Sequence, residues 1–84
     1  MHLEFKAQGY EDMQYWASEK PEKARRIVRL IGEIMRSPHG GIPQPETLKN
    51  ELAGWFSRSI DAKNRVVYQV SGDRLIIAQA RSHF

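Results

Sequence analysis

The chain has 84 residues, 40% of them hydrophobic and 10% aromatic, and its formal net charge at pH 7 is +3. This length and composition predict a single globular domain over residues 1–84 rather than a disordered chain. The sequence contains no cysteine, which excludes structural disulfides and thiolate zinc sites.

The charge is unevenly distributed along the chain. Residues 1–54 hold eight basic and eight acidic residues, whereas residues 55–84 hold five basic residues against Asp61 and Asp73. A basic region favours a polyanionic partner, nucleic acid first, with an ordinary solvated surface as the alternative. No secretion signal is evident, and no apolar run approaches the ~20 residues that span a bilayer. We therefore expect a cytoplasmic protein that does not act at a membrane.

The first half of the chain predicts one strand and two helices. Alternation in Leu3–Lys6 predicts a short strand, and the spacing of Tyr10, Met13 and Ala17 predicts a helix of about ten residues. Pro21 suits the first position of a second helix, which ends before Pro38. The apolar stripe of this second helix consists of Ala24, Ile27, Val28, Ile31, Ile34 and Met35.

Residues 38–54 form an irregular segment that is rich in proline and glycine and long for a simple connection, which favours a functional loop. Leu48 and Leu52 are spaced to form a helical turn, and such a turn would hold Glu46 and Lys49 against the domain.

Three strands are predicted after this segment, at Trp55–Ile60, Arg65–Val70 and Arg74–Ser82, with turns at residues 61–64 and 71–73. The order strand, helix, helix, three strands predicts an α+β domain. In this fold, two helices cover one face of a mainly antiparallel sheet.

The last hairpin offers a test of which side chains share a face. If its loop has an odd number of residues, residues of equal parity lie on the same face. One face then collects an apolar set: Val66, Tyr68, Val70, Ile76, Ala78, Ala80 and Phe84. We therefore predict an odd loop, with Arg65, Arg81 and His83 together on the opposite face. Phe56 and Tyr68 are predicted to be core residues.

These residue types suit metal-free cleavage of RNA. Such cleavage needs a base for the 2′-OH, an acid for the 5′-oxygen and cations for the charge on phosphorus. A carboxylate and an imidazole, with ordinary pKa values of about 4.3 and 6.5, can fill the first two roles. Among the three histidines, His83 is the best candidate because it lies on the basic face. No histidine or carboxylate spacing suggests a metal site, and we expect no cofactor.

The motifs Glu46-x-Leu48-Lys49, Leu52-x-Gly54-x-x-Ser57-Arg58-x-Ile60, Arg65-x-Val67-Tyr68 and Arg81-x-His83-aromatic resemble the YoeB/Txe toxins of type II toxin–antitoxin systems. These toxins belong to the RelE superfamily of endoribonucleases, and the resemblance covers the full chain. It implies a RelE-type, microbial-ribonuclease-like α+β fold. The implied activity is metal-independent cleavage of mRNA in the ribosomal A site, which leaves a 2′,3′-cyclic phosphate and blocks translation.

The resemblance also implies roles for individual residues. Glu46 would be the general base, His83 the general acid and Arg65 the group that stabilises the phosphate in the transition state. Lys49 would be an added cation. Further candidates for substrate or phosphate binding are Arg58, Arg81 and Phe84. The implied partners are mRNA on the ribosome, a cognate antitoxin and a second copy of the chain in a homodimer.

Two positions depart from the family pattern: Ser59 replaces a usual arginine, and Phe84 replaces a usual tyrosine. Loss of the arginine would weaken transition-state stabilisation unless Arg58 or Arg81 substitutes for it. Phe84 can pack or stack but has no hydroxyl to donate. A second hypothesis is therefore a catalytically weakened RNA- or ribosome-binding module. A third, a pure protein-interaction domain, leaves the polar sheet face unexplained.

Overall fold

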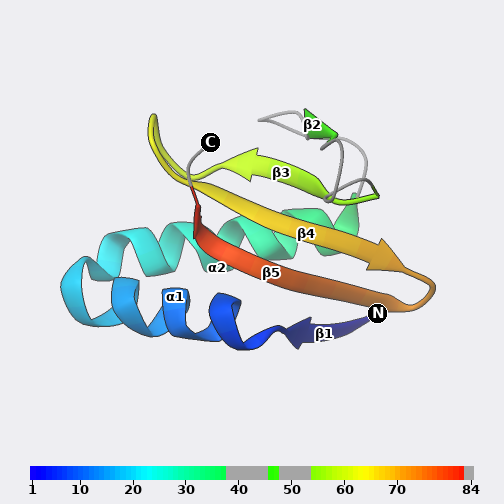
Figure 1. Cartoon of the computed structure of the whole chain (residues 1–84), viewed down its shortest axis with the longest axis horizontal. Helices are drawn as coiled ribbons and strands as arrows, with labels where there is room; N and C mark the ends of the chain where they lie inside the picture. Colours follow the sequence, from blue (N-terminus) through cyan, green and yellow to red (C-terminus); the bar gives the residue numbers. More distant parts are fainter. Residues whose placement is uncertain (38–45, 48–53, 83–84) are drawn as a thin grey trace.

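The computed structural model describes residues 1–37, 46–47 and 54–82. Its elements are β1 (His2–Phe5), α1 (Ala7–Glu19), α2 (Pro21–Arg36), β2 (Glu46–Thr47), β3 (Phe56–Ser59), β4 (Arg65–Ser71) and β5 (Arg74–Ser82). The strands form one sheet in the order β1-β5-β4-β3-β2 (Figure 1). Only the β1–β5 pair within this sheet is parallel. The predicted α+β architecture is confirmed.

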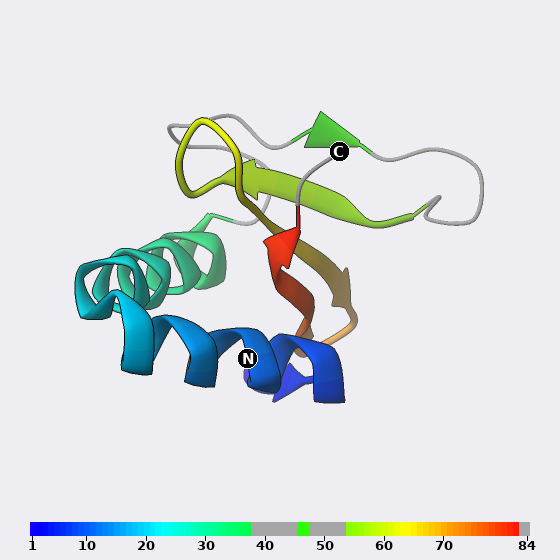
Figure 2. The same cartoon turned by 60° about the vertical axis from the view of Figure 1, so that its left-hand side comes forward.

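The two helices lie side by side on the same side of the sheet (Figure 2). Pro21 is the first residue of α2, as predicted. Proline suits this position because the first backbone N–H groups of a helix have no acceptor within the helix, so its missing N–H costs nothing. Neither described helix has the length and apolar character needed to cross a bilayer.

The hydrophobic core fills the space between the helices and the sheet. Its buried members are Trp16, Ile27, Leu30, Ile31, Ile34, Ile60, Val66, Tyr68, Leu75, Ile77 and Ala80. The stripe predicted on α2 supplies several of them, although Val28 is exposed. Tyr68 is fully buried and stacks on Phe56 with ring centroids 5.9 Å apart, which confirms both as core residues.

Helix α1 covers the edge of β5 beyond the point where β1 ends. Asp12 Oδ2 accepts a hydrogen bond from the backbone N–H of Ala80 (2.9 Å), and Trp16 Nε1 donates to the Ala80 carbonyl (2.8 Å). Two side chains thus satisfy an edge position that a further strand would otherwise pair. Gly9 lets the helix approach closely, because a Cβ there would lie 2.7 Å from the Ile77 carbonyl oxygen.

The β4–β5 hairpin has a two-residue loop, so the predicted odd loop is wrong. Ser71 pairs directly with Arg74, and Gly72 between them has a φ of 60°, which glycine adopts without strain. Near the turn, even-numbered residues of β4 therefore face odd-numbered residues of β5, as in the pair Tyr68–Ile77.

Two register shifts further along the hairpin interrupt this parity. The first makes Val67 face Gln79, a pair of equal parity, and the second makes Arg65 face Ser82. Ile77 and Ala80 both lie in the core. In a regular strand, residues three positions apart would lie on opposite faces. A β-bulge moves side chains from one face to the other, so parity alone could not predict the face of each residue.

Candidate active site

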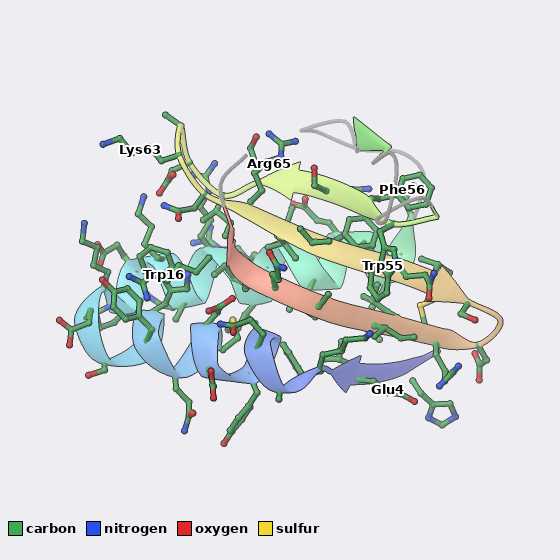
Figure 3. All side chains as sticks on the ribbon, in the orientation of Figure 1. Glu4, Trp16, Trp55, Phe56, Lys63 and Arg65 are labelled. Carbon is green, nitrogen blue, oxygen red and sulfur yellow. The ribbon has the colours of Figure 1, made fainter. Side chains whose placement is uncertain are left out.

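Arg65 is the described residue around which the candidate site is built. It begins β4, next to the core residue Val66, and its side chain extends toward β3 on the face away from the helices (Figure 3). Its Nε donates to Ser57 Oγ at 2.8 Å, and its Nη1 donates to Ser59 Oγ at 3.0 Å. Two bonds from one planar group fix the orientation of this permanently charged guanidinium.

Strand pairing fixes the backbone positions of Glu46, Arg65 and Ser82 relative to one another. Glu46 of β2 pairs with Ser57, the serine that accepts a hydrogen bond from Arg65. On the other side of β4, Arg65 pairs with Ser82, the residue directly before His83 in the sequence. Three strand spacings of about 4.8 Å separate β2 from β5, so these positions span about 14 Å.

Several predicted site residues lie outside the described residues. These are Lys49, His83 and Phe84, together with the side chain of Glu46 and the helical turn predicted around Leu48 and Leu52. The backbone of Glu46 lies in strand β2, which corrects the prediction of an irregular segment there. The catalytic and binding roles of these residues stay predictions.

Arg58 is placed in the interior of the protein. Its side chain is 0% exposed; Nε donates to Tyr68 Oη (3.2 Å), and Nη2 donates to the Ser37 carbonyl (3.0 Å). These contacts join β3, β4 and the end of α2. In this structure Arg58 therefore has a structural position and not the surface position that phosphate binding requires.

Arg81 lies against helix α1, so the prediction that it shares a face with Arg65 is wrong. Its guanidinium carbon is 3.5 Å from the centroid of the Tyr15 ring, which is a cation–π contact. The register shifts in β5 account for the different direction. Arg81 is thus separated from the Arg65–Ser57–Ser59 cluster.

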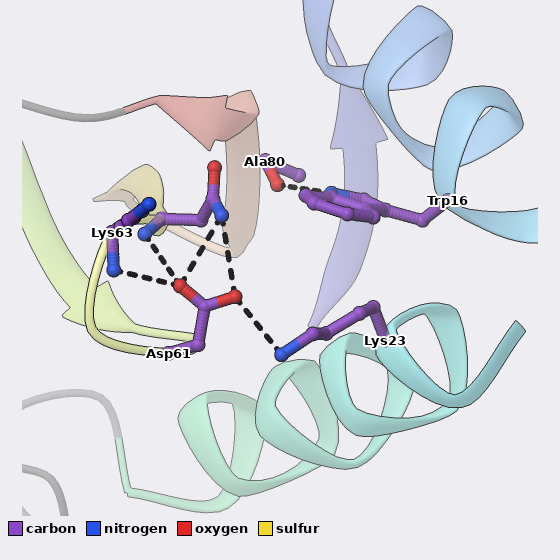
Figure 4. Close-up of polar contacts among 6 residues, drawn as sticks. Trp16, Lys23, Asp61, Lys63 and Ala80 are labelled. Carbon is purple, nitrogen blue, oxygen red and sulfur yellow. Dashed lines mark hydrogen bonds and ion pairs between the residues drawn. The ribbon is translucent and has the colours of Figure 1, made fainter. Parts of the chain in front are cut away.

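Asp61 stabilises the turn that leads into Arg65. Its Oδ1 accepts hydrogen bonds from the backbone N–H groups of Lys63 and Asn64, both at 2.8 Å. Its Oδ2 forms a 2.9 Å ion pair with Lys23 Nζ of α2 (Figure 4). Burial alone would raise the pKa of Asp61, but the Lys23 ammonium and the N–H donors hold that pKa well below its ordinary value.

Sequence reasoning missed the two serines that orient Arg65. Ser59 drew attention only as the replacement of an arginine, and Ser57 only as part of a motif. The sequence did carry a signal for them. Ser57 and Ser59 alternate with Phe56 and Arg58 along the strand, so both hydroxyls lie on the same face.

Comparison with known proteins gives matches over the whole chain. The model of a family described as a YoeB-like toxin of bacterial type II toxin–antitoxin systems matches residues 5–84. A protein from Streptomyces coelicolor named Toxin YoeB is 43% identical over 84 residues, which are 100% of both chains.

Solved structures agree with this match. A YoeB/ParE toxin from Agrobacterium tumefaciens has a TM-score of 0.95 and 36% identity, with 100% of both chains covered. Staphylococcus aureus YoeB, 32% identical, was solved as a YoeB–YefM complex (TM-score 0.90) and as a dimer (TM-score 0.92). Each of these two comparisons covers 100% of this chain and 98% of the other. The expected toxin fold is confirmed.

Proposed function

Because the chain belongs to the YoeB-like toxin family of bacterial type II toxin–antitoxin systems, we propose that it is a ribosome-dependent endoribonuclease that cleaves mRNA in the A site. The observation that carries this proposal is the strand register. It supports the proposal because Glu46 pairs with Ser57, which accepts a hydrogen bond from Arg65, and Arg65 pairs with Ser82, the residue before His83 in the sequence.

The proposed reaction is metal-independent attack of the 2′-OH on the adjacent phosphorus. The Glu46 carboxylate accepts the 2′-OH proton while the new O–P bond forms. The P–O5′ bond breaks, and the His83 imidazolium donates a proton to the leaving 5′-oxygen. Arg65, with Lys49, stabilises the negative charge on phosphorus, and the product has a 2′,3′-cyclic phosphate.

The ribosome would supply much of the substrate orientation. The proposed site has few catalytic groups: one carboxylate, one imidazole and a few cations. Holding the mRNA in a reactive geometry can lower the activation barrier greatly. This division of labour would make the free protein a weak nuclease and confine its activity to mRNA on ribosomes.

We also propose a cognate antitoxin and a homodimer as partners, together with a cytoplasmic location where both partners and mRNA are available. The support is that S. aureus YoeB, of the same family, was solved with YefM and as a dimer. The net charge of +3 favours an acidic antitoxin segment as well as RNA.

The test is cleavage in a translating extract, read as new mRNA 5′ ends by primer extension. We predict that His83→Gln abolishes these ends but leaves the thermal unfolding midpoint unchanged, because the amide cannot donate the proton that the leaving oxygen needs. The control is His2→Gln, at an exposed position of β1, which should cut like the wild type. Undiminished cutting by His83→Gln would remove the assigned acid.

The alternative of a weakened RNA- or ribosome-binding module is favoured by Ser59. That residue stands where the family usually has an arginine, and neither Arg58 nor Arg81 reaches the Arg65 cluster in its place. This alternative predicts ribosome association without new 5′ ends. Ser59→Arg separates the readings, since a gain of cleavage would identify an enzyme weakened by the replacement.

A further inference from the structure

A groove of about 400 Å³ lies between α2 and the end of β3. Its lining residues are Glu22, Lys23, Arg26, Arg29, Leu30, Glu33 and Ser59. All but Ser59 come from α2, so one helix supplies the charged wall. This is space enough for one nucleotide unit.

Two arginines of the groove, Arg26 and Arg29, have no partner among the described residues. Lys23 is committed to Asp61 through a 2.9 Å ion pair. By contrast, the guanidinium groups of Arg26 and Arg29 make no ion pair or hydrogen bond with any residue in the described part of the chain. Both side chains are exposed, so both can turn toward a ligand in the groove.

Ser59 joins this groove to the candidate active site. It lines the groove, and its Oγ accepts the hydrogen bond from Arg65 Nη1 at 3.0 Å. In the described part of the chain, β2 pairs with Ser57 and Phe56, and Ser59 lies two residues beyond Ser57 on β3. The groove and the Arg65 guanidinium are therefore neighbours that share Ser59.

We propose that this groove is a subsite for the RNA strand beside the scissile phosphate, and that Arg26 and Arg29 bind the neighbouring phosphate there. The inference rests on the proposed nuclease function. It also offers a replacement for the positive charge of the arginine that the family usually has at position 59. Arg58 and Arg81 do not supply that charge, since Arg58 is buried and Arg81 lies against the Tyr15 ring. A guanidinium pair can bind a phosphate through several N–H donors at once.

The carboxylates of Glu22 and Glu33 work against an anion in the same groove. Each stands four residues from an arginine on α2, yet no ion pair joins them to Arg26 or Arg29 among the described residues. Glu33→Gln should therefore strengthen RNA binding by removing a repelling charge. An unchanged affinity would show that no phosphate enters the groove.

The main experiment measures binding of a labelled single-stranded RNA of about ten nucleotides, with a 2′-deoxy residue at the scissile position so that it is not cut. Fluorescence anisotropy is recorded at several salt concentrations. Arg26→Gln and Arg29→Gln should each weaken binding about tenfold at low salt. Each should also lower the slope of log affinity against log salt by about 0.7, the value for one lost phosphate contact on a single strand.

Arg25→Gln is the matched control. Arg25 is an exposed arginine on the same helix that does not line the groove, so its loss changes net charge equally. It should leave the salt slope unchanged. Equal effects of all three substitutions would overturn the subsite, because they would report only overall charge. Unchanged RNA binding with weaker binding of a protein partner would overturn it too.

Primer extension in a translating extract separates this inference from the proposed function. If the wild type cuts mRNA while Arg26→Gln and Arg29→Gln behave like Arg25→Gln in both assays, the subsite fails and the nuclease stands. If the wild type cuts nothing but binding still depends on Arg26 and Arg29, the nuclease fails and the RNA subsite stands.

Discussion

At the scale of single residues, the site depends on how Arg65 is held. Its guanidinium is fixed by two serine hydroxyls on the neighbouring strand, at 2.8 and 3.0 Å. Catalysis by charge stabilisation requires the donor to be in place before the reaction, since reorientation during the reaction costs free energy. In the proposed reaction, Ser57 and Ser59 would therefore act as positioning residues for Arg65.

We predict that Ser57→Ala lowers the cleavage rate about fivefold, the equivalent of one hydrogen bond of about 1 kcal/mol. The change is nearly isosteric, so mRNA binding and the unfolding midpoint should change little while single-turnover cleavage slows. Ser18→Ala, which removes an exposed hydroxyl of α1, is the matched control. Equal cleavage rates for Ser57→Ala and the wild type would contradict the positioning role.

The residues of the candidate site were indicated by the sequence, but their surroundings were only partly predictable. Motif resemblance pointed to Arg65, which pairs with Ser82 of β5, while Glu46 of β2 lies on the other side of β3. The burial of Arg58 could not be foreseen, because nothing in the sequence shows that Tyr68 and the Ser37 carbonyl would surround a cation. A charged residue beside core positions is ambiguous until its partners are known.

At the scale of secondary-structure elements, α1 is fixed to β5 by direct backbone contact. Gly9 meets the backbone of Ile77, and Asp12 and Trp16 bond to both polar groups of Ala80. These contacts hold the end of β5, which pairs with Arg65 through Ser82. Helix packing on one face thus fixes a strand that forms part of the site on the other.

Gly9→Ala should destabilise the protein by about 1–3 kcal/mol, because its Cβ would lie 2.7 Å from a backbone oxygen that cannot move freely. For a domain of this size, the unfolding midpoint would fall by about 4–8 °C per kcal/mol, measured by circular dichroism. Gly32→Ala is the control, since its Cβ would have only the Arg36 side chain nearby, at 3.7 Å. That substitution should instead raise the midpoint.

The turn between β3 and β4 depends on the charged form of Asp61. We predict that Asp61→Asn lowers the free energy of unfolding at neutral pH by about 1 kcal/mol, mainly through loss of the Lys23 ion pair. The folded pKa of Asp61 lies below its unfolded value. Its stabilisation is therefore complete above the unfolded pKa of about 3.9 and decreases as the pH falls below that value.

Urea unfolding of the wild type and Asp61→Asn between neutral and acid pH checks this prediction. The difference between the two proteins should shrink in acid. Asp73→Asn is the control, because Asp73 is 72% exposed and its contacts with the N-terminus are at the surface. A difference that stays constant or grows as the pH falls would contradict the assigned charge state.

Element order was easier to predict than strand register. The stripe on α2 and the proline at its start identified that helix closely, because both signals are local. The β4–β5 register depends on a two-residue turn and on bulges, which shift whole sets of side chains together. The prediction for Arg81 failed for this reason, although the strand itself was placed correctly.

At the scale of the whole molecule, the helices and the side chain of Arg65 lie on opposite faces of the sheet (Figure 3). The core between the helices and the sheet stabilises the fold, while the other face carries Arg65 (Figure 3). Ser57 and Ser59 accept hydrogen bonds from its guanidinium. The cavity-lining charges of α2 reach the same region around the β3 edge at Ser59. In the proposed complex, this arrangement would present positive charge on two sides of one RNA strand.

The central claim is that this protein cuts mRNA on the ribosome by attack of the 2′-OH. The most direct measurement is the chemistry of the cut ends on mRNA bound to programmed ribosomes. We predict a 2′,3′-cyclic phosphate upstream, a 5′-OH downstream, and no cleavage when the attacking nucleotide is 2′-deoxy. A 5′-phosphate on the downstream fragment, or cleavage of the 2′-deoxy substrate, would contradict the mechanism.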